Sequence, residues 1–390
     1  MTTLLRNAFN LQYLNYLVFK SPRLLVKISS FSTTFNRLPT KKVTPMNTIK
    51  FSLVGAAVVV ALFGCNSDSN TITTTTPVTL SVSDAPIDDV SEVVITYSKV
   101  AFLPLDGGSP QIFEVYKTDE EGNYVDENGD PIPDGEDPLP LSVNLLNYQG
   151  SEVQELVEDE VIPSGNYKLC VFANDGDHPD YPSYVIDEAT GNQIPLTVKG
   201  DGACPQGVGK EPNSGVLFFN NTFAVNPDNN EFVVEFDLRR GLKDGTGQNE
   251  GYSIQRTSVT LINTVTTGEI QGDVAAQTYA DCEIDTSSAN DYAHAVYLYE
   301  GSVAKEDMGP FAGEDGKATP IAAANVVPDI EQVNYEYEFG FVEPGTYSVG
   351  YTCTANDDSE EGIVAGETFS IYQATSGLTV SAGADTDANF

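Results

Sequence analysis

The chain has no tryptophan, very few histidines and few basic residues. Its 390 residues include two histidines and three methionines, and 19 Lys or Arg stand against 57 Asp or Glu. The sequence also lacks a Gly-x-Ser-x-Gly elbow, a Gly-rich phosphate loop and a His-x-x-x-His pair, so the common motifs of nucleophilic, phosphoryl-transfer and zinc enzymes are missing. We expect no nucleic-acid partner, because such binding depends on Lys and Arg that neutralise phosphates.

Long apolar runs are also missing, apart from one short run near the start. Residues 51–64 are uncharged, mostly apolar and fourteen in number, which is fewer than the roughly 20 residues that a membrane-spanning helix needs. The run follows Lys50 and ends in Leu-Phe-Gly-Cys65. Read from Met46, the stretch resembles a bacterial lipoprotein signal. The resemblance implies removal of residues 46–64, a lipid on Cys65, and an anchor in the cell envelope.

The residue after the cysteine is Asn66, which by the same resemblance implies the outer membrane of a Gram-negative cell. Residues 1–45 hold seven basic residues and no acidic one, a composition that also fits a mitochondrial transit peptide. A transit peptide before a lipoprotein signal would be contradictory. We therefore expect translation to begin at Met46, and residues 1–45 to lie outside the fold.

From Cys65 onward the chain holds 11 basic and 57 acidic residues, a formal net charge of −46. This charge predicts a soluble chain that attracts cations. Two properties would account for this negative charge: solubility in a salty medium, or specific binding of cations.

The apolar residues come in short β-branched and aromatic runs that are separated by 33 Gly and 22 Pro. This pattern predicts an all-β chain, with residues 65–77 as a Thr-rich tether and residues 374–390 as a polar tail. Apolar residues at helical spacing predict one short helix over 151–159. Strands are expected at 78–82, 93–105, 167–172, 216–219, 223–225, 232–238, 258–265, 268–274, 295–299 and 335–341.

An internal repeat in the sequence suggests two related β-sandwiches, over 78–268 and 269–373. Pro163-Ser-Gly-Asn-Tyr167 and Pro344-Gly-Thr-Tyr347 each place a Pro and Gly turn before a tyrosine that starts a strand. Convergence on a common turn is the other interpretation.

Four cysteines remain after Cys65. An even number in an exported chain predicts disulfides, and the order along the chain favours Cys170–Cys204 and Cys282–Cys353 among the three connectivities.

The second half resembles the transthyretin-like (prealbumin-like), or carboxypeptidase-regulatory-like, domain. The resemblance lies in Gly-Glu-Ile-Gln-Gly-Asp-Val at 268–274, Val-Tyr-Leu at 296–298 and the stretch 339–347. It implies a seven-stranded sandwich over 269–373 that acts as a spacer, an adhesion unit or a binding module.

The first half resembles bacterial lipoproteins of the uncharacterised family of domain of unknown function 4382. The stretches that carry this resemblance are Leu-Ser-Val-Ser-Asp-Ala-Pro at 80–86, Asn-Leu-Leu-Asn-Tyr at 144–148, Ile-Pro-Ser-Gly-Asn-Tyr at 162–167 and Phe-Asp-Leu-Arg-Arg at 236–240. The resemblance implies a β-rich domain of a cell-envelope lipoprotein, and it implies no activity.

Two acidic stretches could hold calcium, which takes six to eight oxygen ligands. The candidate ligands are Asp126, Asn128, Asp130 and Asp134 in the first stretch, and Asp175, Asp177 and Asp180 in the second. The first has the spacing of an EF-hand start, but Pro131 stands where the loop glycine should be. A solvated hairpin with a type I′ turn at Asn128-Gly129, and an ordinary Asn/Asp turn around His178, are the favoured interpretations.

The sequence therefore predicts a cell-envelope lipoprotein that acts as a noncatalytic binding or structural module. Its partners would be the membrane, through the lipid anchor, and a glycan or an envelope protein, with calcium as the one candidate cofactor. The absence of tryptophan counts against glycan binding, whereas nineteen tyrosines favour it. The alternative is a carboxylate-based, glycosidase-like hydrolase, which a clustered pair of carboxylates facing a cleft would favour.

Overall fold

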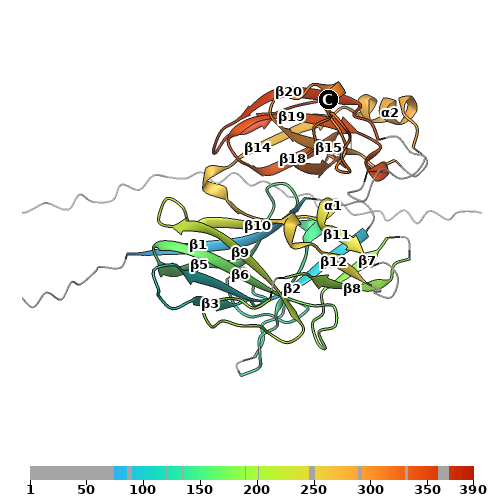
Figure 1. The fold of residues 1–390 in the computed structure, drawn as a ribbon. Helices are drawn as coiled ribbons and strands as arrows, with labels where there is room; N and C mark the ends of the chain where they lie inside the picture. Colours follow the sequence, from blue (N-terminus) through green and yellow to red (C-terminus); the bar gives the residue numbers. More distant parts are fainter. Residues whose placement is uncertain are drawn as a thin grey trace, which may run out of the picture. The chain divides into compact units, whose positions relative to one another are not determined.

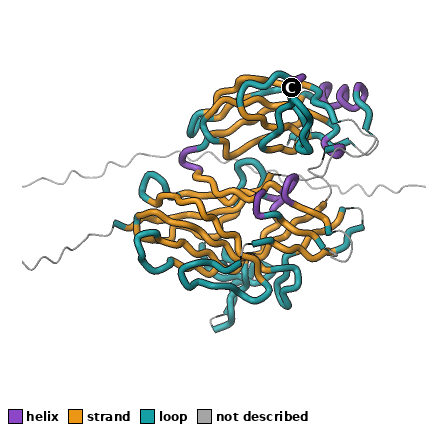
Figure 2. The backbone as a smooth tube through the Cα atoms, viewed as in Figure 1, coloured by secondary structure: helices purple, strands orange, loops and turns teal. Residues whose placement is uncertain are grey.

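Strands make up most of the described chain (Figures 1 and 2), so the predicted all-β fold is confirmed. The structure is a computed structural model, and residues 69–390 form one compact unit in it. It describes residues 74–85, 90–119, 121–133, 135–188, 190–200, 202–245, 251–288, 292–329, 333–358 and 369–390. The proposed signal, Cys65 and most of the tether lie outside these residues. Within them, no helix has both the length and the apolar character needed to cross a membrane.

The first sandwich consists of two facing sheets. One sheet has the strand order β13-β10-β1-β5 and the other β11-β12-β8-β7-β2-β6-β9, with β3 and β4 also paired to β2. The strands of the first sheet are β1 (Thr75–Ala85), β5 (Gln154–Pro163), β10 (Glu231–Asp237) and β13 (Val259–Asn263). Those of the second are β2 (Val90–Pro104), β3 (Gln111–Glu114), β4 (Leu141–Asn144), β6 (Gly165–Asn174), β7 (Tyr184–Asp187), β8 (Gln193–Val198), β9 (Ser214–Val225), β11 (Leu242–Asp244) and β12 (Tyr252–Ile254).

The core of this sandwich follows from period-2 alternation. Leu80 and Val82 of β1 point into the core, as do Val100 and Phe102 of β2. β2 is also buried on its other face, where Leu103 joins a small cluster with Cys170, Phe172, Cys204 and Val216. The Cys170–Cys204 disulfide therefore fastens the loop after β8 over the outer face of the larger sheet.

The second sandwich has the sheet orders β17-β18-β14-β21 and β16-β15-β19-β20. Tyr337 and Phe339 from one sheet and Val349 and Tyr351 from the other fill its core. The strands are β14 (Gly268–Val274), β15 (Ala295–Glu300), β16 (Ala322–Asn325), β17 (Val327–Pro328), β18 (Tyr335–Val342), β19 (Gly345–Thr352), β20 (Gln373–Val380) and β21 (Asp385–Asp387). The helices of the described chain are α1 (Leu238–Gly241) and α2 (Ala276–Asp285), with 3-10 turns η1 (Leu145–Asn147), η2 (Arg256–Ser258), η3 (Thr264–Thr266), η4 (Lys305–Asp307) and η5 (Ala355–Asp357).

The two sandwiches share several strand pairings, which agrees with the internal repeat. The first strand of each pairs antiparallel with the strand before the Pro and Gly turn, β1 with β5 and β14 with β18, and parallel with a late strand, β10 or β21. In both, the turn carries the chain across to the facing sheet, into β6 or β19. Tyr167 and Tyr347 are both buried just after this turn.

Three sequence predictions about the strands, the helix and the tail are wrong. Residues 151–159 form no helix, since residues 154–159 belong to β5. An irregular register of β5 with β1 buries Leu156 and Val157 in succession, and this pattern resembles helical spacing. The polar tail is instead β20 and β21, and the C-terminal Phe390 packs against Tyr337 and Tyr351. Finally, Thr75–Pro77 belongs to β1 and not to the tether.

Candidate binding cleft

The outer face of the β18-β14-β21 sheet carries acidic and amide side chains in two rows. The register places Asp273 of β14 opposite Glu336 of β18, and Gln271 opposite Glu338. On the other side of β14, Gln271 pairs with Asp387 of β21. Alternation sends these side chains away from the core, because their neighbours Ile270, Tyr337 and Phe339 are buried.

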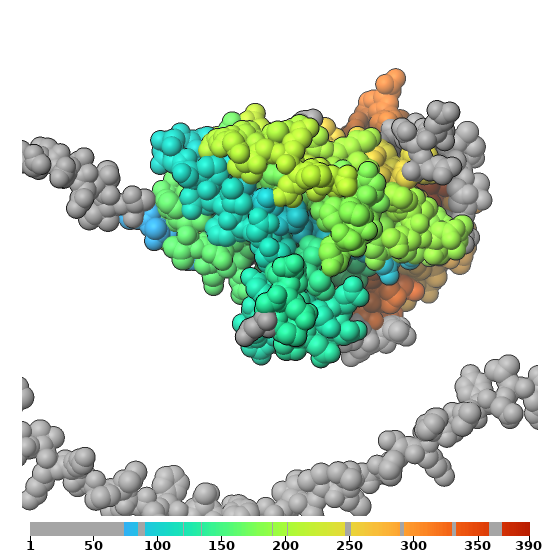
Figure 3. All heavy atoms as spheres, turned by 90° about the horizontal axis from the view of Figure 1, so that it is seen from below, coloured from blue at the N-terminus to red at the C-terminus, as the bar shows by residue number. Residues whose placement is uncertain are grey.

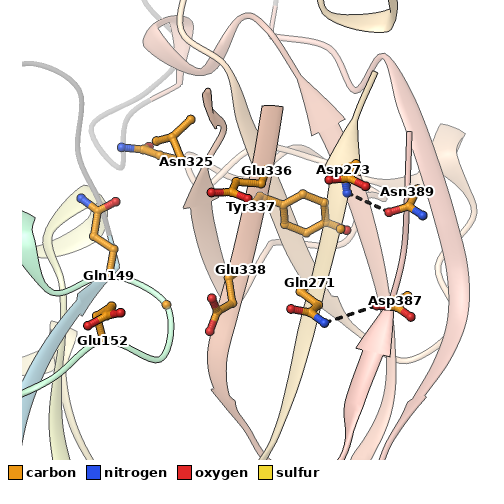
Figure 4. Close-up of a pocket in the computed structure, with 13 residues that line it drawn as sticks. Gln149, Glu152, Gln271, Asp273, Asn325, Glu336, Tyr337, Glu338, Asp387 and Asn389 are labelled. Atoms are coloured by element: carbon orange, nitrogen blue, oxygen red, sulfur yellow. Dashed lines mark hydrogen bonds between the residues drawn. The ribbon is translucent and has the colours of Figure 1, made fainter. Parts of the chain in front are cut away.

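This face forms one wall of a cleft of about 700 Å³ (Figure 4). The opposite wall is the segment after η1 in the first sandwich, with Gln149, Gly150 and Glu152. Glu152, Asp273, Glu336, Glu338 and Asp387 are the acidic lining residues, and the amide residues are Gln149, Gln271, Asn325 and Asn389. No Lys, Arg or His is among the residues that line it in the described chain. The cleft is therefore polar and strongly negative.

The two walls meet through close backbone contacts. The backbone N–H of Ser151 donates to Glu338 Oε1 at 2.8 Å. A Cβ at Gly340 would lie 2.3 Å from the carbonyl carbon of Gly150, and one at Gly150, whose φ is +63°, would lie 2.9 Å from the carboxyl carbon of Glu338. Both glycines are thus required for this approach.

Other contacts order the side chains on the sheet face. Asn389 Oδ1 accepts the backbone N–H of Asp273 at 2.7 Å, and Gln271 Nε2 donates to Asp387 Oδ1 at 3.4 Å (Figure 4). The like charges of Asp273 and Glu336 remain directly opposite each other, which destabilises a strand pair.

The negative charges of this sheet face also affect the carboxyl group of Glu269, which lies on β14 beside them. Burial, followed by the charges of Glu338 and Asp385, raises the pKa of Glu269 above its usual value. A bound cation would relieve this repulsion, because it would stabilise the charged carboxylates.

The first predicted calcium stretch lies on a hairpin that projects from the first sandwich, teal in Figure 3. Asp126 Oδ1 accepts the backbone N–H groups of Asn128 and Asp130, and the N–H of Asp130, with that of Asn128, holds the pKa of Asp126 below its usual value. Lys117 Nζ donates to the carbonyl of Asp126 at 2.8 Å. Positive φ occurs at Gly129 and not at Asn128, so the turn is not of type I′. Asp134 lies outside the described residues.

The second stretch is a turn after β6. Asp175 Oδ1 is buried without a hydrogen-bond partner, and burial, then the charge of Asp177, raises the pKa of Asp175. His178 Nδ1 accepts the backbone N–H of Tyr181 at 3.1 Å, so the histidine helps to form the turn. Nowhere in the described chain do three or more His, Cys, Asp or Glu side chains gather as a metal site would require. Calcium binding by Asp126, Asn128, Asp130, Asp134, Asp175, Asp177 and Asp180 stays a prediction.

Both disulfides that the cysteine order favours are present, Cys170–Cys204 and Cys282–Cys353. Beside the second lies a cluster that sequence reasoning missed. The ring of His294 contacts Tyr351 Oη through Nδ1 at 2.7 Å and Glu283 Oε1 through Nε2 at 3.0 Å, and it stacks on Tyr279 with 3.4 Å between ring centroids. Because both ring nitrogens are engaged and the residue is buried, the cluster holds α2 against the core.

The structure is thus that of an all-β protein with two sandwiches and an acidic cleft. Residues 75–255 match the family described as Domain of unknown function (DUF4382), in agreement with the resemblance over 78–268. None of the curated proteins compared with the chain matches it.

A solved structure found by the comparison is the crystal structure of a "putative adhesin" from Bacteroides ovatus ATCC 8483, with 9% identity over 70% of this chain and 77% of that one. Its TM-score of 0.16 is too low for this likeness to bear on fold or function. The transthyretin-like resemblance of the second half stays a prediction.

Proposed function

We propose that the protein is a noncatalytic binding module of the cell envelope, and that its acidic cleft binds a basic segment of another envelope protein. The observation that carries this proposal is the composition of the cleft, with five carboxylates and no basic residue among its described lining. Electrostatic complementarity of this kind accelerates encounter and excludes acidic partners.

The spacing of the carboxylates favours an extended partner over one metal ion. The acids come from β14, β18, β21 and the segment after η1, and no three acidic or histidine side chains of the described chain gather as a metal site would require. A polypeptide with several Lys or Arg side chains meets such a surface better than a single cation does. The opposed pair Asp273 and Glu336 is where a Lys or Arg side chain would relieve the most repulsion.

The test is binding of a lysine-containing decapeptide to the chain 69–390, measured by isothermal titration calorimetry. We expect binding in 50 mM NaCl that weakens steeply in 500 mM NaCl, because salt screens exposed charges. The double variant Asp273→Asn, Glu336→Gln should bind about tenfold more weakly or worse, since each contact between unit charges contributes about 1 kcal/mol in water.

The matched control is Glu121→Gln with Glu127→Gln on the projecting hairpin. It changes the net charge by the same amount, and both residues are exposed and outside the cleft. Equal weakening by the two double variants would mean attraction to the net charge alone and would refute the cleft as the site. Binding of CaCl₂ at the cleft without peptide binding would also refute this proposal and favour a cation site.

One observation favours the alternative of a carboxylate-based hydrolase. Directly opposed residues of an antiparallel pair have Cβ atoms about 4.5–5.5 Å apart, so Asp273 and Glu336 can approach the roughly 5 Å carboxyl spacing of retaining glycosidases. Hydrolysis of aryl glycosides that is abolished by Glu336→Gln would establish this activity in place of the binding module.

We also propose that a lipid on Cys65 anchors the protein to the membrane, on the basis of the Leu-Phe-Gly-Cys65 stretch. Labelled palmitate should enter the full-length protein in a Gram-negative host, and Cys65→Ser should abolish the label and move the protein to the soluble fraction. A Cys65→Ser protein that stays in the membrane fraction would overturn the anchor.

A further inference from the structure

A second pocket lies in the first sandwich, at its open side between two edge strands. β13 ends one sheet and β9 ends the other, and the pocket between them has a volume of about 370 Å³. It opens where β9 bulges. Tyr167 pairs with Phe223 and Leu169 with Phe219, so Lys168 alone faces the three residues 220–222.

Side chains bridge the two strands at both ends of the pocket. At one end, Arg256 donates to the carbonyl of Phe218 in β9 at 2.8 Å and to that of Val259 in β13 at 3.0 Å. At the other end, Asn263 of β13 donates to Asn229, which donates to the carbonyl of Ala224 in β9. These bridges block an added β-strand from running between the edges, so the pocket suits a compact ligand.

The pocket combines aromatic rings with neutral polar groups. Phe223 is partly exposed, and its ring centroid lies 4.8 Å from that of the buried Phe232. Asn220, Asn221, Thr222 and Thr260 also line the pocket and carry amide or hydroxyl groups. Arg256 is the one charged residue of this lining, and its guanidinium lies over the ring of Phe219 at 4.5 Å.

We propose that this pocket binds a single neutral sugar ring, such as the end of a glycan. The face of an aromatic ring is negative and attracts the C–H groups on one face of a pyranose, while Asn and Thr side chains exchange hydrogen bonds with its hydroxyls. Apart from Arg256, whose guanidinium already donates to the carbonyls of Phe218 and Val259, the described lining residues are uncharged, which favours a neutral ligand. The volume lies within the range of small-ligand sites, about 300–1,000 Å³.

The experiment is saturation-transfer-difference NMR on the chain 69–390 with methyl glycosides of glucose, galactose, mannose and N-acetylglucosamine. We expect at least one to bind, with saturation strongest on the protons of one ring face. Asn221→Ala should weaken that binding about fivefold, the effect of one lost hydrogen bond. Phe223→Leu keeps an apolar side chain but removes the ring, and we expect it to weaken the binding at least as much.

Asn221 is exposed, so its replacement leaves the fold intact, and Asn192→Ala, an exposed asparagine in the loop before β8, is the matched control. Failure of all four glycosides to bind, equal weakening by the Asn192 variant, or equal binding of glucuronate would overturn the proposal. Retained sugar binding in the Asp273→Asn, Glu336→Gln variant is expected, because the pocket does not share a residue with the acidic cleft.

Discussion

Replacement of both Cys282 and Cys353 by alanine should lower the free energy of unfolding by about 4 kcal/mol, the value that the loop-entropy model gives for a loop of this length. The two cysteines are 71 residues apart and fully buried, and their bond ties α2 to the residue after β19. Urea unfolding of the chain 69–390, followed by circular dichroism, measures the loss.

The Cys170→Ala, Cys204→Ala variant is the comparison, because that bond spans 34 residues of the first sandwich and its predicted contribution is again about 4 kcal/mol. The two variants should destabilise different parts of the chain, which amide hydrogen exchange of the two sandwiches can separate. A loss below about 1 kcal/mol in the first variant would show that the cluster of His294, Glu283 and Tyr351 holds α2 without the disulfide.

Glu235→Gln should stabilise the protein by about 2 kcal/mol at pH 9 and have no effect at pH 4. Burial, and then the charge of Asp237, raises the pKa of Glu235 from 4.5 to about 8. A raised folded-state pKa means that the wild-type stability is complete below pH 4.5 and falls as the pH rises toward 8. The full shift would correspond to about 5 kcal/mol at ~1.4 kcal/mol per unit, but Glu235 keeps part of its surface exposed to solvent, which reduces the effect.

Urea unfolding of wild type and variant across pH 4 to 9 tests this expectation. Glu231→Gln, at an exposed position of the same strand, is the control and should leave the pH profile unchanged. Parallel profiles for wild type and Glu235→Gln would show that water reaches the Glu235 carboxylate in the folded protein.

Much of the fold could be predicted from the sequence, because alternation marks strands that are buried on one face. The aromatics of β18 and the opening of β14 show this most clearly. Strands without such alternation are missed or predicted only in part. Residues 216–225 appear as two runs because the bulge at 220–222 is polar, and β20 looks like a tail because Thr, Ser and Gly fill its exposed positions.

The cleft was harder to predict, because strand register and not sequence proximity brings its residues together. Glu336 and Glu338 occupy the outward positions of β18, in which apolar and acidic residues alternate. The alternation is visible in the sequence, but the residues that lie opposite the two glutamates depend on which strand pairs with β18. Asp387 fell in the supposed tail. Asp-rich turns give the stronger signal in the sequence, because their acidic residues are close along the chain, but in the first of them Asp126 accepts hydrogen bonds from the backbone of its own turn.

The parallel pairing of β1 with β10 and of β14 with β21 has a consequence for folding. In each sandwich the first strand can pair with one of its two neighbouring strands only after nearly the whole domain has been synthesised. Examples are the pairs Leu80 with Phe232 and Ile270 with Thr386. Contacts between residues so distant in sequence slow folding. Until β21 pairs with β14, β14 has an unpaired edge, and β21 of a second copy of the chain could pair with it instead. Domain swapping would therefore begin at the late strands.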